Sequence, residues 1–153
     1  MCSSDLYGRR WVIAADIGRK PVTYDGMMRA TLALGDLFGG RFNPGERAGL
    51  LMPSSVPTAA LALGLSRLGH TPAMLNCTVG AQNALACCRA AEIRTVISSR
   101  RFVEAGKLGA LVEAMESAGL SFLWLEDEAR ALGLRAKLTA WFQAHFKIGR
   151  AHV

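Results

Sequence analysis

The sequence lacks most of the motifs that would assign it a chemistry directly. Its four cysteines form no Cys-x-x-Cys pair and no cysteine–histidine spacing typical of a zinc site. Neither the G-x-G-x-x-G dinucleotide fingerprint nor a phosphate loop ending in G-K-[ST] is present, and Gly39–Arg41 is expected to be a turn. No apolar run reaches the roughly 18 residues that a membrane-spanning helix requires. These absences exclude the common signatures of zinc, dinucleotide and nucleoside-triphosphate sites within the sequence.

The composition is that of a globular domain. The chain has 153 residues, of which 51% are apolar and 20% charged, so it can bury one core of ordinary size. Cys87 and Cys88 are neighbours in a helical pattern, which favours small buried residues over a disulfide framework. Unpaired cysteines fit a reduced, cytoplasmic compartment.

The net charge is +6, from 18 basic and 12 acidic residues. A charge of this sign can attract nucleic acid, a membrane surface or an acidic protein. The basic residues are scattered, however, and no aromatic residues alternate with them as a base-stacking platform would need. We therefore expect a solvated surface and no nucleic-acid partner. The one dense basic group comprises Arg94, Arg100, Arg101 and Lys107.

Short β-prone runs alternate with helical patterns along most of the chain. This alternation predicts an α/β fold with a mostly parallel sheet in βαβαβαβ order and right-handed crossovers. Trp11–Ile17 and Val22–Tyr24 are expected to form a separate hairpin at the edge. The parallel strands are expected at residues 47–52, 72–75, 94–98 and 121–125, and the main helices at 26–38, 56–68, 80–91, 101–118 and 129–146.

The helical patterns also predict which residues are buried. The helix at 26–38 is expected to bury Met28, Leu32, Leu34, Leu37 and Phe38. The helix at 56–68 is apolar all round, which is typical of a helix buried on every side. Caps are expected at Thr23 or Asp25, at Ser54–Ser55 and at Ser99, and the helix after Cys77 is expected to open at Thr78 or Gly80.

Three polar groups could carry chemistry, and each has a simpler structural explanation. His70 follows a helix end, with no nucleophile or carboxylate near it in sequence, so a structural role is favoured over catalysis. Glu126–Glu128 could hold a metal where a strand ends, but an acidic first turn of the last helix is the better interpretation. Ser54–Ser55 lacks the G-x-S-x-G elbow of a nucleophilic serine, so capping is favoured.

The two ends of the chain are unusual. Residues 148–153 can be back-translated as ATC GGA AGA GCA CAC GTC, which matches a common short-read sequencing adapter. The reverse complement, read from its GTG, encodes Met-Cys-Ser-Ser-Asp, the first residues of the chain. We expect residues 1–6 and 148–153 to be adapter sequence and not part of the native fold. The natural segment is then expected at residues 7–147, with neither a native start nor a native stop.

Four segments stand in order along this natural part. They are Val22–Tyr24 (VTY), Pro44–Ser55 (PGERAGLLMPSS), Leu68–Asn76 (LGHTPAMLN) and Ala91–Ser99 (AEIRTVISS). Their order and spacing resemble the N-terminal part of the AMP-binding, or adenylate-forming, acyl synthetase superfamily, ahead of the phosphate loop of that family. The resemblance implies that residues 7–147 are part of an AMP-binding domain, its N-terminal subdomain.

Two details resemble one branch of that family. Pro72–Asn76 followed by Cys77–Thr78, and Ser98–Glu104, are similar to the bacterial acyl-[acyl-carrier-protein] synthetase / 2-acylglycerophosphoethanolamine acyltransferase. Cys77 departs from the wider family, which usually has proline there. This branch joins an AMP-binding domain to a glycerolipid acyltransferase domain, sometimes behind a lysophospholipid transporter. The resemblance implies ATP- and magnesium-dependent formation of an acyl-adenylate from a fatty acid, with transfer to acyl carrier protein and on to a lysophospholipid.

The resemblance implies that this segment is inactive alone. The phosphate loop, the adenine-binding motif and the lysine motif of the family would lie beyond it, so no catalytic, cofactor-binding or metal residue is assigned here, and ATP and magnesium are expected only in the full-length enzyme. That enzyme is expected in the cytoplasm, or at the cytoplasmic face of the inner membrane through domains outside this segment. Two alternatives stay open: a fragment of a free-standing acyl-CoA ligase, and a non-catalytic α/β binding module.

Overall fold

The computed structural model describes residues 10–15 and 20–131. The adapter-like ends at 1–6 and 148–153 lie outside these ranges. So does most of the helix expected at 129–146, of which only the beginning is described.

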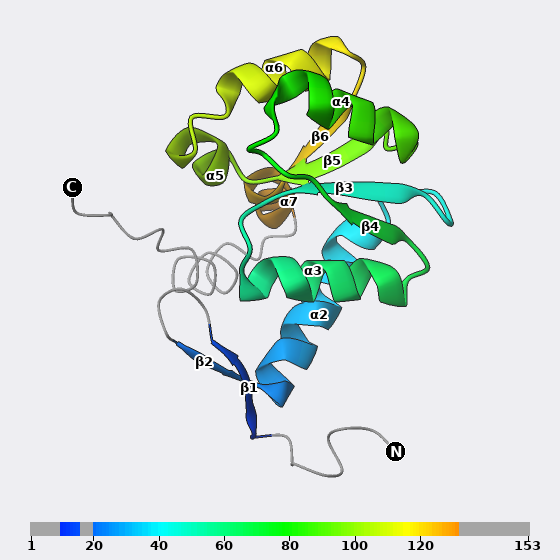
Figure 1. Ribbon diagram of the computed structural model, residues 1–153. Helices are drawn as coiled ribbons and strands as arrows, with labels where there is room; N and C mark the ends of the chain where they lie inside the picture. The colour runs from blue at the N-terminus through cyan, green and yellow to red at the C-terminus, as the bar shows by residue number, and fades with distance from the viewer. Residues whose placement is uncertain (1–9, 16–19, 132–153) are drawn as a thin grey trace, which may run out of the picture.

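A four-stranded parallel sheet forms the centre of the fold (Figure 1). Its strands are β3 (Arg47–Leu51), β4 (Thr71–Met74), β5 (Thr95–Ser98) and β6 (Ser121–Trp124), in the spatial order β4-β3-β5-β6. Every neighbouring pair is parallel. The predicted α/β class and parallel sheet are therefore confirmed.

Helices cover both faces of this sheet, as a parallel sheet requires (Figure 1). Two separate clusters of buried side chains result, one on each face of the sheet. The first lies under α2 (Tyr24–Gly39) and α3 (Val56–Arg67), with α7 (Leu125–Ala131) packed against α2; the second lies under α4 (Gly80–Ala90), α5 (Arg100–Ala105) and α6 (Gly109–Ser117).

A separate hairpin lies at the N-terminal end of α2, away from the parallel sheet (Figure 1). Its strands, β1 (Val12–Ala15) and β2 (Pro21–Thr23), pair antiparallel as predicted. The Thr23 hydroxyl accepts a hydrogen bond from the Gly26 amide at 3.2 Å, which confirms Thr23 as the cap of α2.

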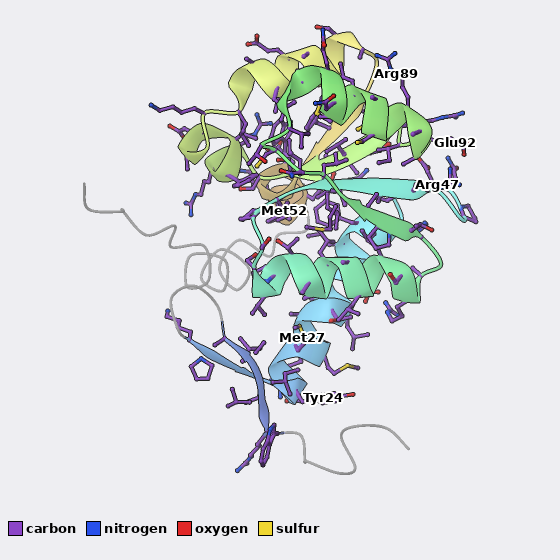
Figure 2. All side chains as sticks on the ribbon, viewed as in Figure 1. Tyr24, Met27, Arg47, Met52, Arg89 and Glu92 are labelled. Atoms are coloured by element: carbon purple, nitrogen blue, oxygen red, sulfur yellow. The ribbon has the colours of Figure 1, made fainter. Side chains whose placement is uncertain are left out.

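At the amino edge of the sheet, Arg47 ties β3 to the end of α4. Its guanidinium pairs with Glu92 and donates to the carbonyl oxygen of Ala91 at 3.3 Å, and Arg47 and Glu92 lie together in Figure 2. A cation there satisfies a carbonyl that the helix leaves without a partner. Met52, also labelled, lies at the opposite, carboxyl edge (Figure 2).

The expected buried face of α2 is wrong in part. Met28 and Leu32 are 41% and 40% exposed, whereas Leu34, Leu37 and Phe38 are buried as expected. The face that packs on α3 contains Thr31 and Gly35, two residues that an apolar count overlooks. A Cβ at Gly35 would lie 2.9 Å from the Cα of Gly64 in α3, so the small residues are what bring the helices into contact.

The helix α3 is not buried on every side, contrary to the expectation. Leu63 is 54% exposed and Leu68 is exposed as well, while Ala60, Leu61 and Leu65 are fully buried. Only one layer of helices covers this face of the sheet, so the outer side of α3 faces solvent. A uniformly apolar pattern does not reveal which side that is.

The single helix expected at residues 101–118 is two helices, α5 and α6. The chain leaves α5 at Lys107, which adopts a left-handed φ of 52°. The Leu108 amide then donates to the Val103 carbonyl at 2.9 Å, the bond that closes a Schellman turn. This turn lets Leu108 pack on the same core cluster as Val103, and the break follows from that contact.

The Gly35–Gly64 contact yields the first prediction. A Cβ at Gly64 would lie 2.5 Å from the Thr31 carbonyl oxygen and 2.8 Å from the Gly35 Cα. Gly64→Ala should therefore force α2 and α3 apart and lower the free energy of unfolding by about 2 kcal/mol, measured by urea denaturation. Gly109→Ala is the control, because a Cβ at this helical position meets nothing within 4 Å. Equal stability of the two variants would contradict the proposed packing.

Candidate functional site

The carboxyl edge of the parallel sheet is the candidate position for a ligand site. In open α/β sheets, ligands bind where the strand order reverses, outside the carboxyl ends of the strands. Here that point lies between β3 and β5, which are neighbours although their connecting helices cover opposite faces. The Ser98 hydroxyl at this point donates to the Leu51 carbonyl at 2.8 Å and closes the gap between the two strands.

Glu126 occupies the N-terminus of α5 at this edge. Its carboxylate accepts hydrogen bonds from the Ser99 hydroxyl at 2.7 Å and from the Arg100 amide at 3.1 Å, with the Arg101 amide at 3.5 Å. Ser99 is buried, and its side chain makes no cap bond to its own helix. Ser99 therefore holds the N-cap position of α5, as expected, but its side chain does not cap the helix; Glu126, in the first turn of α7, accepts from these amides instead.

This arrangement has a consequence for ligand binding. A helix N-terminus beside a strand end is where a phosphate would bind in many α/β proteins. Here a carboxylate of the chain itself already fills that position, with three donors directed at it. A phosphate would have to displace Glu126, so the N-terminus of α5 is a structural junction rather than a phosphate site.

Each of the other two members of the acidic triplet pairs with an arginine. Asp127 accepts from the Arg100 guanidinium at 2.5 Å, and Glu128 pairs with Arg41 at 2.7 Å. All three carboxylates lie in the first turn of α7, as predicted. Within residues 10–15 and 20–131, no cluster of three histidine, cysteine, aspartate or glutamate residues is suited to a metal ion. The triplet thus joins α7 to α5 and to the loop after α2.

A groove of about 560 Å³ lies beside Trp124, between β6, α5 and the start of α6. The Arg100 guanidinium carbon lies 4.7 Å from the centre of the Trp124 ring, and the Phe122 ring stacks on Trp124 at 5.3 Å. The two side chains that contact the Trp124 ring, Arg100 and Phe122, both belong to this chain, and Asp127 already pairs with Arg100. The polar side chains left on the groove are Glu104 and Lys107, which do not form a nucleophile–base pair.

Ser55, the second of the two serines after β3, has the capping role that was favoured. The Ser55 hydroxyl accepts from the Thr58 amide at 3.4 Å, and the Thr58 hydroxyl donates to the Pro53 carbonyl at 2.7 Å. The Asn76 side chain makes a similar turn after β4, where it accepts from the Thr78 amide at 2.9 Å. The expected start of the next helix at Thr78 or Gly80 is confirmed, because α4 begins at Gly80.

His70 is a structural residue, as favoured. It is buried, its Nε2 lies 3.2 Å from the Gly39 carbonyl oxygen, and its ring lies 5.6 Å from the Phe42 ring. If Nε2 carries the proton, it donates to this carbonyl and ties β4 to the end of α2. The carboxyl edge of the sheet, where ligands bind in this fold class, lies at the other end of the strands.

The expected basic group is divided between two places. Arg100 and Lys107 line the groove beside Trp124, whereas Arg94 lines a smaller cavity of about 190 Å³ at the amino end of the sheet. The sequence pattern does not predict the ion pair between Arg100 and Asp127. These two residues are 27 positions apart on different elements, and no local pattern signals such a pair.

The fold resembles that of several solved structures. The N-terminal domain of FACL13 from Mycobacterium tuberculosis superposes with a TM-score of 0.66 and 18% identity, over 87% of this chain and 34% of that one. A benzoate CoA ligase from Burkholderia xenovorans LB400 gives 0.59 and 22% identity, over 76% of this chain and 23% of that one. No protein-family profile matches the sequence.

A further match is a Mycobacterium tuberculosis fatty acyl CoA synthetase, with a TM-score of 0.66, 18% identity, and 87% of this chain and 26% of that one covered. The chain therefore shares the fold of the part of these proteins on which it superposes. It spans about a third or less of the length of these solved proteins.

The Glu126 junction yields the second prediction. Glu126→Ala leaves the Ser99 hydroxyl and the first amides of α5 without their acceptor. The free energy of unfolding should fall by about 1–3 kcal/mol. Amide hydrogen exchange should speed up at Arg100 and Arg101. Glu113→Ala, an exposed glutamate within α6, is the control and should have little effect. Unchanged exchange at α5 would show that Glu126 is not its cap.

The vicinal cysteines yield the third prediction. Cys88 is 2% exposed whereas Cys87 is exposed. Burial raises the pKa of the Cys88 thiol above its ordinary value, and the adjacent Cys87 adds to the rise. In a Cys2→Ser, Cys77→Ser background, iodoacetamide should alkylate Cys88 at least about tenfold more slowly than Cys87, because the thiolate must both form and be reachable.

The raised pKa also fixes the sign of a pH effect. The folded state favours the protonated Cys88 thiol, so its contribution to stability is complete below the ordinary thiol pKa and is lost as pH rises beyond it. Cys88→Ala should remove this part of the alkaline loss of stability. Equal alkylation rates at Cys87 and Cys88 would contradict both the slower reaction expected of Cys88 and the burial from which the pH effect is derived.

Proposed function

We propose that this chain is the N-terminal portion of an ATP-dependent acyl-activating enzyme, one that forms an acyl-adenylate from a carboxylic acid. The observation that carries the proposal is the fold: 87% of the chain superposes on the N-terminal domain of FACL13, with a TM-score of 0.66. The four sequence segments that resemble the AMP-binding superfamily all lie within the residues that the structure describes. Pro44–Ser55 contains β3, and Ala91–Ser99 contains β5.

The segment is proposed to serve as scaffold. It spans about a third of the FACL13 domain, so most of an enzyme of that size would lie outside it. The carboxyl edge supports this view, because Glu126 fills the N-terminus of α5 and the Trp124 ring already contacts Arg100 and Phe122. ATP and magnesium would then be held by residues beyond this segment, and the segment alone would be inactive.

The substrate is proposed to be a fatty acid, and two acceptors compete. The details at Pro72–Thr78 and Ser98–Glu104 favour acyl carrier protein, with onward transfer to a lysophospholipid in the cytoplasm or at its membrane face. The matches to fatty acyl and benzoate CoA ligases favour coenzyme A at least as well. No helix in the described part of the chain has the length and apolar character to cross a membrane.

The fourth prediction tests the activity. The reading frame should be extended in the source DNA and the longer polypeptide assayed for fatty-acid-dependent exchange between ATP and pyrophosphate. We expect exchange from the longer polypeptide and none from the 153-residue chain. Exchange by the 153-residue chain would contradict the scaffold role, and a stop codon directly after the natural segment would favour a non-catalytic module.

The same polypeptide distinguishes the acceptors. Labelled fatty acid and ATP are supplied with either acyl carrier protein or coenzyme A, and the labelled thioester is identified. Transfer to the carrier protein alone would support the phospholipid-recycling branch. Transfer to coenzyme A alone would assign the chain to the free-standing ligases.

A further inference from the structure

The cavity of about 190 Å³ at the amino end of the sheet combines positive charge with an apolar floor. Two arginines line it: Arg89, in the last turn of α4, and Arg94, directly before β5. Between them the floor is formed by apolar side chains and one thiol, those of Leu85, Cys88, Ile93 and Leu120. The cavity therefore differs from a solvated charged surface, where basic side chains face only water.

Neither arginine of this cavity has an acidic partner. Most other arginines pair with a carboxylate, as Arg47 does with Glu92 and Arg67 with Asp36. Among residues 10–15 and 20–131, no ion pair joins Arg89 or Arg94 to an aspartate or glutamate. Two positive charges thus line one cavity with no negative charge of the described chain to balance them.

The backbone does not provide an alternative partner. A basic side chain near a helix end can satisfy a carbonyl oxygen there, but at the end of α4 Arg47 has this role, because it donates to the Ala91 carbonyl at 3.3 Å. The Cys88 carbonyl accepts from the Ile93 amide at 2.9 Å. In the part of the chain that the structure describes, the Arg89 guanidinium forms no hydrogen bond, so its donors are free for a ligand.

The two ends of the helices on this face give the cavity its position. Figure 2 shows Arg89 and the Arg47–Glu92 pair at the same end of α4, with Arg89 on the side of α6. The end of α6, at Ala118 and Gly119, lines the cavity opposite α4. The cavity therefore lies between two packed helices, at the sheet edge opposite the one considered for a ligand site above.

We propose that this cavity binds a small organic carboxylate. The carboxylate would lie at the Arg89 and Arg94 guanidiniums, whose planar N–H donors match a carboxylate in a bidentate geometry. The hydrocarbon part would lie on the apolar floor, on Leu85, Ile93 and Leu120. This inference does not rest on the proposed function, since it concerns a different edge of the sheet and needs no catalysis.

Size and chemistry together limit the ligand. A volume of about 190 Å³ equals that of roughly six molecules of liquid water, so the hydrocarbon part must be short. Inorganic phosphate would satisfy the arginines but would leave the apolar floor to water. Hexanol would cover the floor but would leave the arginines without an anion. Hexanoate has both parts and is the probe, with phosphate and hexanol as comparison ligands.

The fifth prediction is a nuclear magnetic resonance titration of the 153-residue chain with hexanoate. Amide resonances from Arg89 to Arg94 should shift and saturate, with Kd on the order of 1 mM. Arg89→Gln and Arg94→Gln should each raise Kd about fivefold or more, because each removes a charged donor. Arg101→Gln is the matched control and should leave Kd unchanged. Arg101 is also an exposed arginine without an ion pair in the described residues, but it does not line this cavity.

The buried thiol gives a second measurement at the same cavity. Cys88 lines the cavity, whereas the neighbouring Cys87 does not. In the Cys2→Ser, Cys77→Ser background, saturating hexanoate should slow the alkylation of Cys88 by iodoacetamide about threefold or more, because the ligand blocks access to the thiol. The rate at Cys87 should stay the same, which excludes a general effect of hexanoate on the reagent.

The remaining outcomes would overturn the proposal. An absence of saturable shifts, or an equal Kd in Arg89→Gln, Arg94→Gln and Arg101→Gln, would show that the two arginines do not form an anion site. Phosphate that binds as tightly as hexanoate would assign the cavity to inorganic anions, and hexanol that does so would show an apolar pocket without charge selection. None of these results changes the exchange assay, so the proposed function stands or fails separately.

Discussion

The structure depends on the burial of β3 from both sides. Ala48 and Leu50 are fully buried and Leu51 almost so, with one set of side chains in the cluster under α2 and α3 and the other under α4 and α6. A parallel strand of this kind is stable only when both of its faces are covered by helices. Every other element of the βαβ unit takes its position from that requirement.

Two small-residue contacts make this coverage close enough. Gly35 and Gly64 bring α2 and α3 into backbone contact, and Gly49 leaves space for Ile93, Val96 and Leu75 on the opposite face. Cores pack at high density, so such contacts determine how near the helices lie. At the carboxyl edge, the elements are joined by carboxylates instead of by close packing. Glu126 accepts hydrogen bonds at the N-terminus of α5, and Asp127 and Glu128 form ion pairs with neighbouring arginines.

The carboxyl edge of the sheet and the hairpin differ in how far their side chains are partnered within the described residues. The polar groups at the strand ends satisfy one another. By contrast, Val12 and Ile13 of the hairpin are exposed.

The sequence alone determined the element order, the parallel sheet, the hairpin and the Thr23 and Ser55 caps, because these depend on local periodicity and on residues a few positions apart. It could not identify the buried face of α2, since Thr31 and Gly35 are buried through a contact with another helix. The break at Lys107 and the role of Glu126 also depend on residues distant in sequence. Tertiary structure decided them, because packing and capping across elements are selected by position in space and leave no periodic signal in the chain.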